Sequence, residues 1–316
     1  MKIIKTQFSA LRCCLVLGSA LALAACAKVE DHSSFKTPEA AVDALVAALQ
    51  KDDTAALQKL LGPGTEDLLS SGDPVQDNAD REDFIARYQQ KHSLEQAGDD
   101  AMTLVVGDND WPAPIPIVRK DGKWRFDGAA GADEIIYRRV GENELGAIGV
   151  SLGFVDAQNE YASEGRDGDP AGVYALKLIS DEGTQNGLYW PTAEGETPSP
   201  AGPFVAAAAA EGYRRGESRT PYHGYYYRML YAQGPNANGG AKEYFEDGVL
   251  TGGFALVAWP ADYGSSGVMT FIVNQDGVVF QKDLGDDTAT AVDAIQAFDP
   301  DSSWTAIVPP AEEPGT

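Results

Sequence analysis

The sequence predicts an α+β fold in which N-terminal helices and a small curved sheet precede a long helix and an antiparallel β-meander. Residues 251–285 contain three apolar runs, and residues that favour turns separate them. The predicted strands are 253–259, 268–273 and 278–284. Earlier in the chain, apolar side chains recur at helical spacing, above all in residues 37–61 and 132–161. The order of these patterns indicates helices that pack on sheets.

The turns of the C-terminal sheet are the most specific local signals. Pro260 ends the first strand, and residues 263–267 form a glycine- and serine-rich reversal. The second turn, Asn274-Gln275-Asp276-Gly277, supplies side chains that hydrogen-bond locally and a glycine that accepts positive φ. Two tight turns between three short strands predict antiparallel pairing.

The first 26 residues have the layout of a lipoprotein signal. Lys2, Lys5 and Arg12 precede the apolar run 15–22, and small residues lead to Cys26, as in a bacterial lipobox. A transmembrane helix is the alternative, but the apolar run is shorter than the ~20 residues that a span requires. We therefore expect removal of residues 1–25 and lipidation of Cys26.

Lipidation determines the expected location of the protein. Acyl chains on Cys26 would hold the protein at a membrane of the bacterial cell envelope, facing the periplasm. Ala27 after this cysteine favours the outer membrane by analogy with enterobacterial sorting. The other cysteines, Cys13 and Cys14, lie in the signal, so the mature chain would lack disulfides and thiol chemistry.

The charge of the chain is strongly negative. Its 316 residues include 48 acidic and 24 basic side chains, which gives a net charge of −24, and removal of three basic residues with the signal makes it −27. Such a surface repels nucleic acids and anionic lipid headgroups. We expect no nucleic-acid partner, and membrane attachment through the lipid alone.

After a tether at residues 26–36, residues 37–128 form the expected N-terminal α+β domain. Thr37 and Pro38 are typical of a helix start, and residues 62–64 end a second helix. The predicted elements are a helix that starts at 37 and runs through the segment 40–53, helices 53–61 and 80–92, and strands 101–106, 113–119 and 122–126. Prolines in residues 112–118 place that strand at an edge or a bulge.

Residues 129–306 form the expected C-terminal domain, and a disordered tail follows at 307–316. Its long helix, 132–161, is expected to break near Gly141 and to pack through Leu145, Ile148, Leu152 and Val155. A loop-rich stretch at 164–217 follows this helix. The remaining predicted elements are a strand at 225–233 and a short helix at 289–298.

Four motifs carry a resemblance to a known family: SSGDPV (70–75), GLYWP (187–191), PYHGYYYR (221–228) and the run 252–285. Together they resemble the bacterial lipoprotein family known as domain of unknown function 2950, over about residues 36–306. The resemblance implies no activity and no catalytic residue. The N-terminal elements resemble cystatin-like folds related to nuclear transport factor 2. The C-terminal helix and meander resemble the heads of type IV pilins and pseudopilins.

Aromatic stretches are the main candidates for ligand binding. Aromatic rings with polar rims suit sugars, proline-rich segments and other peptides. His223 could act as a base, and Arg228 could hold a carboxylate. Packing of these side chains in the core is the competing interpretation. The candidate ligand-binding residues are Tyr189, Trp190, Tyr222, His223, Tyr225 and Arg228.

Asp167 and Asp169, with Asp181 and Glu182 further along, are the candidate metal ligands. Carboxylates on a flexible loop suit calcium, but the spacing of an EF-hand is missing, so an acidic turn is the competing interpretation. The three histidines are widely separated, which argues against a zinc site. Nucleotide-binding glycine motifs are absent from the sequence, so no nucleotide cofactor is expected.

The sequence therefore favours a lipid-anchored envelope protein that binds or scaffolds without catalysis, with an envelope protein or glycan as partner. One alternative is an envelope hydrolase that uses His223 with Asp262 or Glu194. Ser265 and Ser266 add the atoms of a triad, but no nucleophile-elbow pattern surrounds them. Another alternative is a pilin-like assembly subunit.

Overall fold

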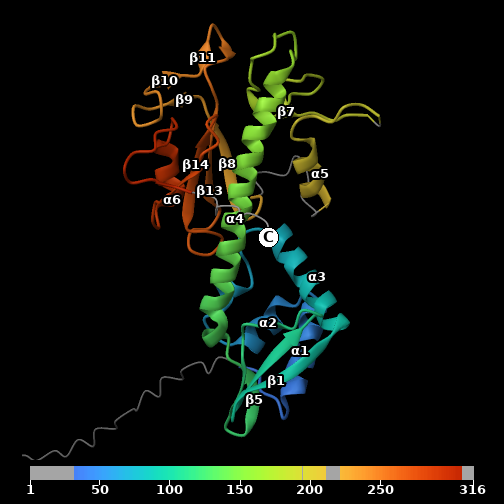
Figure 1. The fold of residues 1–316 in the computed structure, drawn as a ribbon. Helices are drawn as coiled ribbons and strands as arrows, with labels where there is room; N and C mark the ends of the chain where they lie inside the picture. The colour runs from blue at the N-terminus through green and yellow to red at the C-terminus, as the bar shows by residue number, and fades with distance from the viewer. Residues whose placement is uncertain (1–31, 194, 211–220, 308–316) are drawn as a thin grey trace, which may run out of the picture. The chain divides into compact units, whose positions relative to one another are not determined.

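The computed structural model describes residues 32–193, 195–210 and 221–307, which contain helices and mostly antiparallel sheets (Figure 1). The α+β class is therefore confirmed. The predicted signal, Cys26, most of the tether, Glu194 and the tail from residue 308 lie outside the described residues. None of the helices in the described part of the chain combines the length and the apolar character that crossing a bilayer requires.

The predicted helical hairpin at the N-terminus is present. The helices here are α1 (Pro38–Gln50), α2 (Thr54–Leu61), the 3-10 turn η1 (Glu66–Leu68) and α3 (Pro74–Gln90). The Thr37 side chain accepts a hydrogen bond from the Ala40 N–H and caps α1.

The predicted start of α3 at residue 80 was wrong. The helix begins six residues earlier because Asp73 caps it, accepting hydrogen bonds from the N–H groups of Val75 and Gln76, and because Pro74 fits the first helical position. The helix thus occupies part of the stretch that was interpreted as a turn-rich connection.

A small antiparallel sheet follows, with the strand order β1-β2-β4-β5 and with β3 also paired to β2. Its strands are β1 (His92–Gly98), β2 (Ala101–Val106), β3 (Trp111–Pro112), β4 (Ile117–Lys120) and β5 (Lys123–Phe126). Strand β1 was not predicted, since it is exposed along nearly all its length and shows no apolar alternation. Pro114 and Pro116 lie in the interruption between β3 and β4, as their missing N–H groups require.

Apolar side chains of α1 and α2 and of this sheet form one hydrophobic cluster. Its most deeply buried members are Ala41, Val42, Leu60, Leu104, Val106, Ile117 and Phe126. Gly128, where the next helix begins, lies so close to the Leu61 carbonyl that a Cβ there would come within 2.4 Å of the oxygen.

The helix α4 (Gly128–Ser163) has 36 residues and is therefore about 54 Å long. The predicted break near Gly141 was wrong, because the helix continues through this position. A single glycine in an exposed helix costs only about 1 kcal/mol relative to alanine, and the surrounding turns outweigh that cost.

The predicted packing face of α4 was correct for Val155, which is buried, and for Ile148, which packs against the core, but wrong for Leu145 and Leu152. Leu145 is 72% exposed and Leu152 is 40% exposed, whereas Asn143 and Gln158 are buried. These polar residues are buried because they are hydrogen-bonded: Asn143 donates to the Ser266 carbonyl, and Gln158 exchanges two bonds with the backbone of Ala175. The buried residues of α4 include Asn143, Ala147, Ser151, Phe154, Val155, Gln158 and Tyr161.

Helix α4 packs on a five-stranded antiparallel sheet of order β16-β15-β14-β13-β8, mainly over β13 and β14 (Figure 1). Its strands are β8 (Tyr225–Leu230), β13 (Ala255–Pro260), β14 (Met269–Asn274), β15 (Phe280–Asp283) and β16 (Thr305–Ala306). The predicted meander is confirmed as β13-β14-β15. At its second turn the Asn274 side chain accepts from the Asp276 N–H, and Gly277 has φ 73°.

Shorter elements complete the C-terminal part. Strands β6 (Lys177–Ile179) and β7 (Gly187–Tyr189) pair in parallel, and α5 (Gly202–Ala210) follows. The other pairs are β9 (Ala232–Gln233) with β10 (Lys242–Glu243) and β11 (Phe245–Glu246) with β12 (Val249–Leu250). The last helix comprises α6 (Thr288–Ala291) and the 3-10 turn η2 (Val292–Ala294), so it ends before the predicted residue 298.

Candidate functional site

Tyr225, at the start of β8, belongs to the hydrophobic core. Its side chain is fully buried, and its hydroxyl donates a hydrogen bond to the Met269 carbonyl over 2.9 Å. Burial raises the pKa of Tyr225, and the nearby Glu144 carboxylate adds to this shift. The aromatic ring and the polar rim of this candidate are thus both engaged inside the protein.

Two further side chains of β8 also hold backbone carbonyls. The Tyr227 hydroxyl donates to the Tyr222 carbonyl over 3.2 Å, and burial raises the pKa of Tyr227. Arg228 donates to the carbonyls of Val292 and Ile295 over 2.8 and 3.0 Å. The guanidinium therefore closes the end of η2, which otherwise leaves carbonyls without donors.

His223 lies in the turn before β8, with φ 50° in the left-handed region. Its half-buried ring lies 4.2 Å from the Tyr222 ring, centroid to centroid, and its Cβ lies against Gly146 of α4. Among the described residues, no hydrogen-bond partner of the His223 ring is found.

The other residues of the predicted triad hold the reversal before β14. The Ser266 hydroxyl is buried and exchanges hydrogen bonds with the backbone of Asp262. Ser265 accepts from the Arg139 guanidinium over 3.4 Å. Within the described ranges, no hydrogen bond joins either serine to His223, and the predicted hairpin loop is confirmed at this position.

The second aromatic stretch lies elsewhere on α4. Trp190 contacts Tyr161 edge-to-face at 6.4 Å between ring centroids, whereas His223 lies beside Gly146. Fifteen helical residues separate these two positions, a distance of about 22 Å along the axis. The structure therefore does not bring the two aromatic stretches into one surface.

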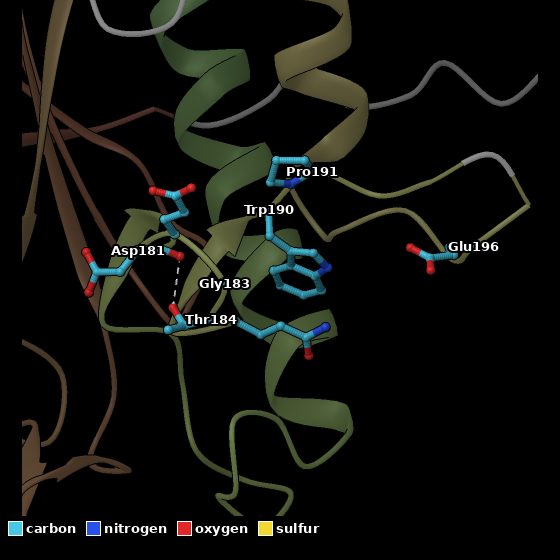
Figure 2. Close-up of a pocket in the computed structure, with 8 residues that line it drawn as sticks. Asp181, Gly183, Thr184, Trp190, Pro191 and Glu196 are labelled. Carbon is cyan, nitrogen blue, oxygen red and sulfur yellow. Dashed lines mark hydrogen bonds between the residues drawn. The ribbon is translucent and has the colours of Figure 1, made fainter.

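Trp190 forms part of a surface hollow of about 560 Å³ (Figure 2). Most of the hollow is made by the loop that joins β6 to β7. The lining residues are Asp181, Glu182, Gly183, Thr184, Gln185, Trp190, Pro191 and Glu196. This volume lies in the range of sites that bind small ligands.

Internal hydrogen bonds fix the β6–β7 loop. Asp181 accepts from the Lys177 ammonium over 2.5 Å and from the Asn186 amide over 2.9 Å. The Asn186 side chain in turn accepts from the Asp181 N–H and from the Thr184 hydroxyl. The hydrogen bonds from Lys177 and Asn186 lower the pKa of Asp181, so this carboxylate is held ionised.

Trp190 presents an edge to the hollow. Its side chain is only 8% exposed, and the Arg166 guanidinium lies 5.1 Å from the centre of the ring. The indole nitrogen points toward the side of the hollow that contains Glu196 (Figure 2). No described residue accepts a hydrogen bond from this nitrogen.

Two acidic side chains of the rim also have unused hydrogen-bonding capacity. Glu196 accepts from the Ala193 N–H through one carboxylate oxygen. In the part of the chain that is described, Glu182 is exposed and has neither a hydrogen bond nor an ion pair. The rim therefore combines carboxylate acceptors with N–H donors from Trp190 and from the Gln185 amide.

The candidate calcium ligands lie close to this loop. Asp167 has φ 54° and accepts from the Gln185 N–H over 3.4 Å, and the Asp169 N–H donates to the Arg166 carbonyl over 2.8 Å. The described residues contain no group of three or more histidine, cysteine, aspartate or glutamate side chains placed to hold a metal ion. Calcium binding at Asp167 and Asp169 remains a prediction.

The sequence pointed to parts of this site separately. Trp190 and Pro191 were expected in an aromatic surface, Asp181 and Glu182 in a metal loop, and Glu196 as an exposed loop acid or one of a carboxylate pair. Thr184 and Gln185 were not predicted. The polar run 180–186 between two short apolar segments was the available signal, but its meaning depends on the pairing of β6 with β7.

The fold and the hollow define an α+β protein with a polar loop and a largely buried tryptophan at a surface hollow. The chain belongs to the family described as "Protein of unknown function (DUF2950)", whose model matches residues 32–307. The predicted membership of this domain family is thereby confirmed, and the lipoprotein nature remains a prediction. No curated protein and no solved structure matches the chain, so the likenesses to pilins and to nuclear transport factor 2 remain predictions.

Proposed function

We propose that this protein is a lipid-anchored component of the bacterial cell envelope and a non-catalytic binding module whose ligand occupies the hollow beside Trp190. The observation that carries the proposal is the indole N–H of a tryptophan that is 8% exposed and lacks an acceptor among the described residues. This nitrogen opens on the hollow, so a ligand there can accept its hydrogen bond in place of water. An envelope protein or glycan facing the periplasm is the proposed class of partner.

The contacts of the predicted catalytic residues support binding over hydrolysis. His223 does not line the hollow, and the Ser266 hydroxyl is hydrogen-bonded to the backbone of Asp262. His32 and His92 also contact backbone carbonyls, those of Leu60 and Tyr88. None of the three histidines is thus paired with a nucleophile by a hydrogen bond in the described ranges, although a general base needs such proximity.

Site-specific crosslinking in living cells tests the binding role. A photoreactive amino acid in place of Gln185 should capture a partner, because this exposed side chain lines the hollow and is not one of its carboxylates. The same amino acid in place of Glu95, an exposed residue of β1, is the control and should not capture that partner. Addition of Trp190→Phe to the Gln185 probe should reduce capture. Turnover of an envelope polymer that disappears in His223→Ala would instead support the hydrolase alternative.

The anchor is tested separately. Acylation of Cys26 should be found by mass spectrometry of the protein from its host, and Cys26→Ser should leave the protein in the soluble fraction. An unmodified Cys26 in the native protein would contradict this part of the proposal.

A further inference from the structure

We propose that the hollow beside Trp190 recognises a cationic peptide segment, through a lysine or arginine side chain at the carboxylates of the rim and a peptide carbonyl at the indole N–H. This inference rests on the proposed binding function and specifies the chemistry of its ligand. Two independent features of the hollow support it, the charge of the rim and the hydrogen-bonding state of Trp190.

The rim has an excess of negative charge. Asp181, Glu182 and Glu196 line the hollow, and only Asp181 is paired with a described cation, Lys177. Arg166 is the cation that contacts Trp190, but its side chain is 13% exposed and pairs with Glu164 at 3.4 Å. The carboxylates of Glu182 and Glu196 therefore remain available to an ammonium or guanidinium group from outside.

Trp190 distinguishes a peptide from a simple amine. Its ring is largely covered, so the part that reaches the hollow is the N–H edge and not a face for stacking. An N–H donor requires an acceptor, and an amine that is fully protonated has none. A peptide with lysine or arginine offers a cation and a carbonyl together, whereas a neutral saccharide offers acceptors but no cation.

The net charge of the whole chain also favours a cationic ligand. A net charge of −24 attracts basic segments and accelerates their encounter with the protein at low ionic strength. Because the rim carboxylates are exposed, added salt should weaken binding. Uronic-acid and phosphate polymers would be repelled by the same charges.

Isothermal titration calorimetry on the detergent-solubilised mature protein tests this assignment. The probe is an N-acetylated, C-amidated tetrapeptide with two lysines, compared with its Lys→Gln counterpart, with spermidine and with the neutral sugar chitotetraose. We expect the lysine peptide to bind about tenfold more tightly than the glutamine peptide at low salt. Spermidine should bind more weakly than the lysine peptide because it cannot accept from the indole.

Matched variants locate the interaction. Exposed ion pairs contribute modestly, so the double variant Glu182→Gln/Glu196→Gln should weaken binding of the lysine peptide about tenfold. The double variant Glu95→Gln/Glu243→Gln removes the same charge from exposed sites on β1 and β10 and should leave the affinity within about twofold. Trp190→Phe removes the N–H and should weaken binding about three- to tenfold.

The possible outcomes separate this inference from the binding function. Equal affinity for the lysine and glutamine peptides, spermidine binding as tightly as the lysine peptide, or binding of chitotetraose in place of the peptide would each overturn the cationic-peptide assignment. If no probe binds but the Gln185 position still captures a partner, the binding function stands and the assignment is wrong. If both experiments fail, the binding function is wrong as well.

Discussion

The two aromatic stretches of this protein look alike in sequence but differ in how the chain uses them. In residues 221–228, the hydroxyls of Tyr225 and Tyr227 and the guanidinium of Arg228 all donate to backbone carbonyls. In residues 187–191, the N–H of Trp190 meets a hollow and has no acceptor among the described residues. The two stretches therefore differ in the hydrogen bonding of their polar atoms more than in their rings. Polar atoms bonded to the backbone indicate a structural role, whereas one that faces a hollow indicates a candidate binding site.

The largest expected loss of stability comes from a substitution in the buried aromatic stretch, residues 221–228. Tyr225→Ala should lower the free energy of unfolding by about 3–5 kcal/mol, because it empties a fully buried position and orphans the Met269 carbonyl. Urea denaturation measures this change. Tyr137→Ala is the matched control, since Tyr137 is 70% exposed, and it should change stability by less than about 0.5 kcal/mol. Similar losses in both variants would contradict the core assignment.

A smaller loss is expected at the turn that starts β8. Gly224 has φ 67°, and a Cβ there would lie 2.4 Å from the Asn143 amide nitrogen. Gly224→Ala should therefore cost about 2–4 kcal/mol, from backbone strain together with a steric clash. Gly264→Ala, at φ 80° with open space around the Cβ, isolates the strain and should cost about 1–2 kcal/mol. Equal costs in thermal or urea unfolding would show that the contact with Asn143 is unimportant.

The buried tyrosines should also make the free energy of unfolding depend on pH. Burial raises the pKa of Tyr244 to about 12, and burial raises the pKa of Tyr225 and Tyr227 still further. Each of these tyrosines makes its full contribution to the free energy of unfolding below about pH 10, where the hydroxyl is protonated in both states. The contribution is lost as the pH rises through the raised pKa of the folded state, which is about 12 for Tyr244. Tyr244→Phe should make stability fall less steeply with pH in this window. An unchanged slope would show that Tyr244 does not ionise on unfolding.

The smallest effect on stability is expected at the hollow. Trp190→Phe keeps a ring against Tyr161 and Arg166 and removes an N–H that no described residue uses. Because Trp190 also packs in the hydrophobic core, the smaller ring should lower the free energy of unfolding by about 1–2 kcal/mol in urea denaturation. A loss comparable to that of Tyr225→Ala would place Trp190 with the scaffold.

Local signals made part of the fold predictable. Thr37 caps the first helix, and Asn274 and Gly277 shape the meander turn through contacts within a few residues of themselves. The face of α4 was not predictable in this way. Its buried Asn143 donates a hydrogen bond to the carbonyl of Ser266, which lies far away in the sequence. Its buried Gln158 donates to the carbonyl of Ala175, which lies in a segment without regular secondary structure.

The candidate site was predictable only in pieces. Trp190 belongs to an apolar motif, whereas Glu182 and Glu196 belong to polar loops, and sequence spacing does not relate them. The parallel pairing of β6 with β7 turns residues 180–186 into one wall of the hollow. Because the two strands are very short, the sequence contains no alternation of apolar and polar residues that would predict their pairing.

The most direct test follows the indole N–H resonance of Trp190 in ¹⁵N-labelled protein, assigned by its loss in Trp190→Phe, during titration with the lysine tetrapeptide. We predict that this resonance shifts with the peptide while the backbone amides of residues 222–228 stay in place, because the ligand occupies the hollow and not the scaffold. An unmoved indole resonance together with shifts in residues 222–228 would contradict the account.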